Sequence, residues 1–332
     1  MKRVLKWILG AVLLLFFSYF LGPRPPKPSF RITDYGLPSS PIELEKKINE
    51  SEKLVTGLKP DNQARIVWAD TLKKEKTKIV FLYLHGFSAS QAEGDPVHRD
   101  LAKKYNANLF LSRLAEHGTN LGDSTMFGLT ADNYLASAER ALQTAEKLGD
   151  EVVVIGTSAG GALSLILASM HPEIKAIVLY SPCVKLYNST AWILNKPWGL
   201  QIARQASGGK VQRFPSEGSE HANYWSLNYR TEALVSLQNL ITYTMSPKTF
   251  SAIKCPVFLG YYYKNEKEQD NTVSVPAMLA MFDELGTPAS LKEKMAFPET
   301  GAHVIASHIR SKDWQSVEKE TGKFLSDIVK LQ

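Results

Sequence analysis

The sequence predicts an α/β fold in which helices flank a mostly parallel central sheet. Along the 332 residues, short apolar runs alternate with stretches of helical pattern. Two of these runs, 79–84 and 152–155, are continuously apolar, as expected of strands that helices cover on both faces. Strands that alternate with helices favour a parallel sheet, because each helix returns the chain to start a neighbouring strand in the same direction.

The elements are predicted in order along the chain. Strands are expected at 64–69, 78–84, 107–111, 151–155, 176–180 and 256–262. Helices are expected at 41–53, 96–105, 130–148, 160–170, 276–285 and 313–329. Pro41 suits the first position of the first helix, and glycines at 149 and 286 are expected to end the third and fifth. Between Tyr180 and Ile253 there is no clear strand, and a stretch this long is typical of a functional insertion.

The excess positive charge lies in the N-terminal part of the chain. The net charge is +6 at pH 7, yet six of the 39 basic residues fall in positions 1–31, where there is no acidic residue. The rest of the chain therefore carries 33 basic and 33 acidic residues. This neutral body argues against nucleic acid as a partner, because a nucleic-acid surface needs basic residues gathered on the folded domain.

An apolar segment near the N-terminus predicts a membrane anchor. Residues 4–22 as a helix would be about 28 Å long, enough to cross a bilayer. Bulky aromatic residues end the run where a cleaved signal peptide would have small ones. We expect a single-pass anchor over 1–22, a proline-rich linker over 23–29 and a catalytic domain over 30–332 outside the cytoplasm. A cleaved signal peptide and a buried N-terminal helix are the alternatives.

The two cysteines, Cys183 and Cys255, are predicted to be unpaired. They are too few for a disulfide framework or for a four-ligand zinc site of the usual kind. The predicted strands place them at opposite edges of the sheet, on the order of 15 Å apart by strand rise, which is too far for a disulfide.

The strongest catalytic signal is Gly156-Thr157-Ser158-Ala159-Gly160, a G-x-S-x-G pattern between a predicted strand and a predicted helix. In this context a sharp turn presents the serine hydroxyl at the C-terminal edge of the sheet. Glycine is expected on either side, since side chains there would clash across the turn. Ser158 is therefore the candidate nucleophile, and the alternative is a glycine-rich turn with a passive serine.

A serine nucleophile of this kind needs a carboxylate later in the chain. Asp270 is the expected acid, because it follows the strand at 256–262 and leads into the next helix. Glu266 and Glu268, in the same charged loop, are its rivals. The segment 181–216, after the preceding strand, contains no acidic residue and supplies no alternative.

His303 is the expected general base, because it lies in a loop after the acid and before the last helix. It would take the proton of Ser158 while the carboxylate fixes its tautomer. The competing histidines are His171, His221 and His308.

His85-Gly86-Phe87 follows the strand at 78–84 and predicts one half of an oxyanion hole. The backbone N–H groups of Phe87 and Ala159 would bind the developing negative charge. The side chains of His85 and of His117 are expected to be structural.

Taken together, these motifs resemble those of the α/β-hydrolases. The matching segments are LHGF at 84–87, RLAEHG at 113–118, GTSAGG at 156–161, Asp270-x-x-Val273 and Gly301-x-His303. Over about residues 60–332 the chain looks like the capped branch of carboxylesterases and monoacylglycerol lipases, also called the serine-aminopeptidase-like group. The resemblance implies an α/β-hydrolase fold. The loop 263–270 is longer and more charged than the Gly-x-x-Asp usual in that family.

The aromatic-rich insertion, at about 182–251, is expected to be a helical cap over the catalytic edge of the sheet. A cap there would build an apolar acyl pocket and exclude water. Trp192 and Trp225 are its candidate substrate-binding residues, and a preference for medium acyl chains is expected.

The sequence therefore predicts a membrane-anchored serine hydrolase that cleaves carboxylic esters of a small or lipid-like molecule through an acyl-enzyme. An acyltransferase or an amide or peptide hydrolase with the same triad is the alternative, followed by a catalytically inactive binding module. Serine, histidine and acid suffice for this chemistry, so no metal or organic cofactor is expected.

Overall fold

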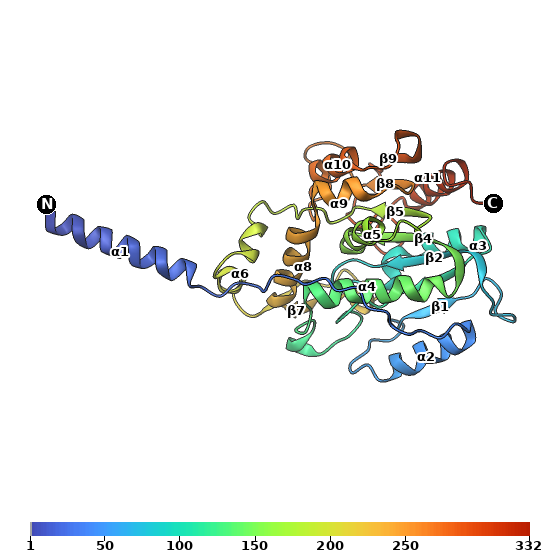
Figure 1. Cartoon of the computed structure of the whole chain (residues 1–332), viewed down its shortest axis with the longest axis horizontal. Helices are drawn as coiled ribbons and strands as arrows, with labels where there is room; N and C mark the ends of the chain where they lie inside the picture. The colour runs from blue at the N-terminus through green and yellow to red at the C-terminus, as the bar shows by residue number, and fades with distance from the viewer. Residues whose placement is uncertain (1) are drawn as a thin grey trace.

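A seven-stranded sheet forms the centre of the computed structural model, which describes residues 2–332 (Figure 1). The strand order is β1-β3-β2-β4-β5-β8-β9, and neighbouring strands are parallel except β1, which runs antiparallel to β3. The strands are β1 Arg65–Val67, β2 Thr77–Leu84, β3 Asn108–Leu111, β4 Gly149–Thr157, β5 Ala176–Tyr180, β8 Val257–Tyr261 and β9 Lys292–Ala296. The prediction of a mostly parallel sheet is confirmed.

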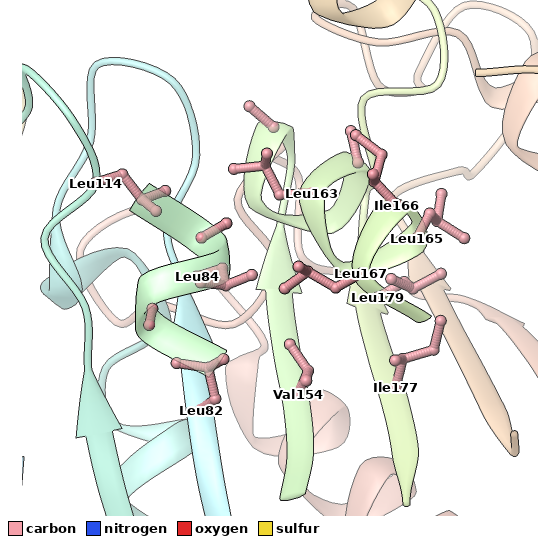
Figure 2. Close-up of a cluster of buried hydrophobic side chains, with 14 of the residues drawn as sticks. Leu82, Leu84, Leu114, Val154, Leu163, Leu165, Ile166, Leu167, Ile177 and Leu179 are labelled. Atoms are coloured by element: carbon pink, nitrogen blue, oxygen red, sulfur yellow. The ribbon is translucent and has the colours of Figure 1, made fainter. Parts of the chain in front are cut away.

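Helices cover both faces of this sheet. Along β2, alternate side chains point to opposite faces and enter two different cores. Leu82 and Leu84 join the core beneath α4 and α5, whereas Phe81 and Tyr83 join the core beneath α3 and α11. Figure 2 shows part of the first core, where leucines of α5 meet side chains of the strands. The helices of the body are α2 Pro41–Lys53, α3 Val97–Lys104, α4 Ala131–Glu146, α5 Ala159–Met170, α9 Pro247–Ala252, α10 Val275–Glu284 and α11 Trp314–Asp327.

All the predicted strands and helices of the body are present. The short helix α9 was not predicted, and Gly149 and β9 also differ from the prediction. Gly149 was expected to end a helix, but it is the first residue of β4, where a Cβ would lie 2.6 Å from the side chain of Val80. The edge strand β9 was not predicted, because its sequence, Lys-Glu-Lys-Met-Ala, is charged. Its residues are partly exposed rather than buried on both faces.

The long insertion follows β5 and contains short strands as well as helices. Its expected lack of strands is wrong, since β6 Val211–Arg213 pairs with β7 Asn228–Arg230. Its helices are η3 Ala191–Asn195, α6 Gly199–Ala206, α7 Ser219–Tyr224 and α8 Thr231–Thr244. Because α8 packs against both α4 and α5, the insertion is fixed to the body beside the helix that follows Ser158.

The N-terminal helix α1, Lys2–Phe20, projects away from the body (Figure 1). Its segment Arg3–Phe20 is apolar and long enough to cross a membrane, and none of it is buried against the rest of the protein. Residue 1 of the predicted anchor lies outside the described residues. The linker after α1 is extended and touches the insertion, where the Trp198 N–H donates to the carbonyl oxygen of Pro23.

Both cysteines are free thiols, as the sequence predicts. Cys183 is buried after β5, and Cys255 precedes β8.

Candidate active site

Ser158 lies in the turn between β4 and α5 at the C-terminal edge of the sheet. Its backbone has φ 54° and ψ −117°, a left-handed conformation that is strained for any residue with a side chain. A Cβ on Gly156 would lie 2.5 Å from the carbonyl oxygen of Gly160, and a Cβ on Gly160 would lie 2.7 Å from that of His85. The turn therefore requires glycine at both positions, as the G-x-S-x-G pattern predicts.

Asp270 and His303 meet at the same edge of the sheet, in the loops after β8 and β9. Nδ1–H of His303 donates to Oδ2 of Asp270 at 2.6 Å. The other oxygen of Asp270 accepts the backbone N–H groups of Thr272 at 2.9 Å and Val273 at 3.0 Å. The carboxylate is completely buried, and these three donors occupy three of its lone-pair positions.

Asp270 and His303 shift each other's pKa toward the charged forms. Burial by itself raises the pKa of Asp270, but the charge and hydrogen bond of His303 bring the pKa below its usual value. Burial lowers the pKa of His303, but the Asp270 carboxylate outweighs it and raises that pKa, and Glu93 adds to the effect. A raised pKa means that the imidazole is a stronger base than a free histidine.

The long charged loop before Asp270 forms a small excursion that closes on itself. Tyr263 bridges Gln269, and the Asp270 N–H donates to the carbonyl oxygen of Tyr262 at 3.2 Å, directly after β8. Glu266 and Glu268 stay exposed in this excursion and bond to neighbours within it. The loop is longer than the family pattern, but its extra residues do not displace Asp270, which still lies at the end of β8.

The three competing histidines contact groups other than Ser158 and Asp270. His171 contacts Glu139 at 2.9 Å behind the elbow helix. The ring of His308 is 3.0 Å from the carbonyl oxygen of Asp95. His221 does line the pocket described below, but its Nδ1 accepts the backbone N–H of Glu217.

Ser158 and His303 line one pocket of about 490 Å³. The structure brings them to the same pocket but does not join them by a hydrogen bond. Among the described residues, Nε2 of His303 has no hydrogen-bond partner. This nitrogen, opposite the one bonded to Asp270, is an acceptor available to a hydroxyl in the pocket.

The segment after β2 brings a second backbone amide to this pocket. A Cβ on Gly86 would lie 3.0 Å from Cβ of Ser158, so the segment runs beside the elbow. Within residues 2–332 the N–H groups of Phe87 and Ala159 donate to no other protein group. Two unpaired N–H groups beside a serine are the arrangement that an oxyanion hole requires.

His85 and His117 are structural, as the sequence suggests. Nε2 of His85 accepts the Leu114 N–H at 3.1 Å, which leaves Nδ1–H to donate to the Gly86 carbonyl oxygen at 3.0 Å. Burial lowers the pKa of His85 to about 4, so the ring is neutral. The ring of His117 stacks on Tyr134 with centroids 5.2 Å apart.

The insertion supplies much of the pocket wall, but only one of the two predicted tryptophans. Trp225 is 8% exposed and lines the pocket, whereas Trp192 is 55% exposed in η3 and does not. The Trp192 ring instead faces Nζ of Lys196. Two other aromatic residues of the insertion, Phe214 and Tyr229, which were not predicted to bind substrate, stack at 5.5 Å in the wall. Their sequence neighbourhood gives no pattern that separates them from core aromatics.

Glu93 is a further pocket residue that the sequence analysis missed. It lies in the short helix η1, Gln91–Gly94, between β2 and α3, and is 2% exposed. Its carboxylate accepts the N–H of Gly86. One signal was available in the sequence: Glu93 is the only acidic residue in the segment 85–94, which begins with His85-Gly86.

No protein-family model matches the sequence. A thermostable monoacylglycerol lipase of Bacillus sp. (strain H-257) is 27% identical over 197 residues, which are 58% of this chain and 72% of that protein. An esterase/lipase of Mycoplasma genitalium is 31% identical over 125 residues, 37% of this chain and 44% of that protein, so the chain spans less than half of this second relative.

Solved structures agree on the fold. A metagenome-derived lipolytic enzyme aligns with a TM-score of 0.64 and 18% identity over 81% of this chain and 98% of its own. A monoacylglycerol lipase of Paleococcus ferrophilus aligns with a TM-score of 0.57 and 13% identity over 81% and 98%. The chain has the α/β-hydrolase fold, and the proteins similar to it are lipases and esterases.

Proposed function

We propose that this α/β-hydrolase-fold protein is a carboxylic ester hydrolase that works through Ser158, His303 and Asp270. The observation that carries the proposal is the buried hydrogen bond of 2.6 Å between Asp270 and His303, whose other ring nitrogen is unpaired among the described residues of a pocket that Ser158 also lines. The lipase and esterase names of the similar proteins agree with ester hydrolysis.

The reaction has two halves. In the first, Nε2 of His303 takes the proton of the Ser158 hydroxyl as its oxygen attacks the ester carbonyl carbon. The carbonyl oxygen becomes an oxyanion that accepts the N–H groups of Phe87 and Ala159. The intermediate then expels the alcohol, which receives the proton from His303, and leaves an acyl group on Ser158. In the second half, His303 takes a proton from a water molecule as it attacks the acyl carbon. The bond between the acyl group and Ser158 then breaks, the carboxylic acid leaves, and Ser158 recovers its proton from His303.

Asp270 supports both halves by holding the imidazole. Its carboxylate accepts Nδ1–H, which keeps Nε2 unprotonated and directed away from Asp270. When His303 becomes cationic, the same carboxylate stabilises the charge. Because Asp270 is itself held by the N–H groups of Thr272 and Val273, the imidazole has one fixed orientation.

The pocket supports an acyl group or a lipid-like ester as the substrate. Its walls combine aromatic and aliphatic side chains with polar ones, among them the ion pair of Arg310 and Glu217. The residues contributed by the insertion are Cys183, Leu186, Phe214, Pro215, Glu217, His221, Trp225, Ser226, Leu227, Tyr229, Leu234 and Leu237. Since each methylene transferred from water is worth about 0.8 kcal/mol, medium acyl chains should be preferred to acetyl.

The test uses the full chain in detergent. The wild type should hydrolyse p-nitrophenyl esters in a series from acetyl to palmitoyl and should react with a fluorophosphonate probe. Ser158→Ala should do neither while keeping its circular dichroism spectrum, and near-normal turnover by this variant would overturn the proposal. Amide substrates and added alcohols in the same assay separate ester hydrolysis from amide hydrolysis and acyl transfer.

We further propose that α1 anchors the protein in a membrane with the catalytic domain outside the cytoplasm. The support is an apolar helix of sufficient length, none of which is buried against the body; its one hydrogen bond to the insertion, from Trp198 to the carbonyl oxygen of Ser18, lies near its end. The full chain should then stay with membranes after carbonate extraction. A mature N-terminus near residue 23 would instead identify a cleaved signal peptide.

A further inference from the structure

Glu93 is a buried carboxylate in the pocket that the proposed reaction does not use. It lies between β2 and α3, and only 2% of it is exposed. Moving a carboxylate out of water is unfavourable unless hydrogen bonds compensate it. Among the described residues, Glu93 forms no ion pair with a lysine or an arginine, although Arg310 lines the same pocket and pairs with Glu217 there. A buried carboxylate beside the elbow without such a partner calls for a role in the site.

The hydrogen bonds of Glu93 connect the two loops that carry the candidate oxyanion amides. Its Oε2 accepts the N–H of Gly86, which precedes Phe87. The same oxygen is 3.5 Å from the hydroxyl of Tyr83, and that hydroxyl is 3.0 Å from Oγ1 of Thr157, which precedes Ser158. All of these side chains are buried, so water does not compete for the contacts.

The direction of the Phe87 N–H depends on the peptide that Gly86 shares with it. The carbonyl oxygen of Gly86 accepts Nδ1–H of His85 at 3.0 Å and the Ala89 N–H at 3.3 Å. The N–H of Gly86 is held by Glu93 on its other side. With both polar groups of Gly86 engaged, the next peptide plane, and with it the Phe87 N–H, has one orientation.

The space at Gly86 is already filled by the same two partners. A Cβ there would lie 2.7 Å from Oε1 of Glu93 and 3.0 Å from Cβ of Ser158. The carboxylate, the loop and the nucleophile are thus in direct packing contact. A shift of Glu93 moves the loop relative to Ser158.

We propose that Glu93 is a positioning residue, which holds the loop 85–88 so that the Phe87 N–H faces the oxyanion formed on a substrate bound to Ser158. This proposal rests on the proposed function and adds a residue to it. An amide side chain can accept the same N–H, so glutamine should substitute in part, whereas alanine leaves the Gly86 N–H buried and unpaired.

The charge of Glu93 provides a second readout. Burial raises the pKa of Glu93 to about 7, against the Gly86 hydrogen bond and the charge of His303. Its negative charge in turn helps to raise the pKa of His303. The titratable groups that face it are Tyr83 of β2, Tyr134 of α4 and His303 after β9.

The experiment compares Glu93→Ala, Glu93→Gln and Glu139→Gln in the full chain. Glu139 is a matched control, since it is equally buried, 1% exposed, but contacts His171 behind α5. Glu93→Ala should lower kcat by about 10- to 100-fold with little change in KM, as expected when a group that stabilises the transition state is misplaced by up to about 1 Å. Glu93→Gln should restore most of kcat.

The pH profile separates positioning from a general loss of stability. Without the carboxylate charge, the pKa of His303 falls, so the acidic limb of kcat/KM should move to lower pH in Glu93→Gln. Glu139→Gln should leave that limb in place. Hydrogen exchange provides a readout that does not need activity: the peptide 84–89 should exchange faster in Glu93→Ala than in the wild type or in Glu139→Gln.

Wild-type kcat in Glu93→Ala, or the same loss of kcat in Glu139→Gln, would overturn the proposal. Unchanged exchange of 84–89 in Glu93→Ala would overturn it as well. If the wild type hydrolyses no ester, the proposed function fails, and the exchange experiment still decides whether Glu93 holds the loop.

Discussion

Gly160 lies directly against the backbone that ends strand β2, so that a Cβ on it would overlap the carbonyl oxygen of Leu84. This contact joins the first turn of α5 to the loop that carries Phe87. It therefore sets the spacing between the two amides proposed for the oxyanion hole. The same glycine also allows the sharp turn at Ser158. A side chain at position 160 would therefore disturb both the turn and the spacing of the two amides.

Gly160→Ala should destabilise the fold and abolish esterase activity. Overpacking of a filled interior typically costs about 1–3 kcal/mol, and here the neighbour is backbone, which cannot rotate away. Gly209→Ala is the control, because a Cβ there meets nothing within 4 Å. Thermal unfolding and ester turnover measure both variants. A stable, active Gly160→Ala would mean that the elbow is less tightly packed than described.

The acid assignment gives a second prediction. Asp270→Asn should reduce kcat by about 10⁴-fold, because the imidazole loses the acceptor that fixes its tautomer. Glu266→Gln and Glu268→Gln should retain the wild-type kcat, since both side chains are exposed and contact only their own loop. Steady-state kinetics at one pH rank the three variants, and the opposite ranking would move the acid to the loop.

How far the sequence predicts the site depends on whether the signal is local. The elbow glycines and Ser158 could be predicted because the turn itself restricts residue type within five positions. Asp270 and His303 could be proposed because their order along the chain matches the order of strand ends. Their contact was expected from these roles, but its geometry could not be predicted, since it depends on how the excursion 263–269 closes.

Contacts between side chains that depend only on tertiary packing could not be predicted from the sequence. Trp192 and Trp225 look alike as aromatic residues of one insertion, and only the packing of α7 beside η1 decides that Trp225 reaches the pocket. Glu93 likewise has no motif of its own. Its contact with Gly86 arises because the chain turns back on itself within eight residues and buries the carboxylate there.

His171 provides a prediction about pH and stability. Its hydrogen bond to Glu139, with the charges of Glu139 and Glu173, raises the pKa of His171 to about 9 despite partial burial. A raised pKa in the folded state stabilises the fold fully below the unfolded-state value near 6.5, and the contribution disappears as the pH rises through about 9.

The stability lost in His171→Gln should therefore be larger at pH 6 than at pH 10. Because the ring is partly exposed, solvent screening reduces the effect. Thermal unfolding of the wild type and the variant across this range measures it. An equal difference at both pH values would show that the ion pair contributes nothing and that His171 acts only by packing.

The last prediction concerns the acyl pocket and uses the two tryptophans as a matched pair. Trp225 is buried in the pocket wall, where its side chain packs in one cluster with Ala89 of the loop after β2. Trp192 is exposed outside the pocket. Trp225→Ala should lower kcat/KM more for octanoyl than for acetyl esters, because a longer chain loses more apolar contact. Trp192→Ala should leave the ratio of the two esters unchanged. An unchanged ratio in Trp225→Ala, measured on the same ester series, would show that the acyl chain lies elsewhere and that the insertion only covers the site.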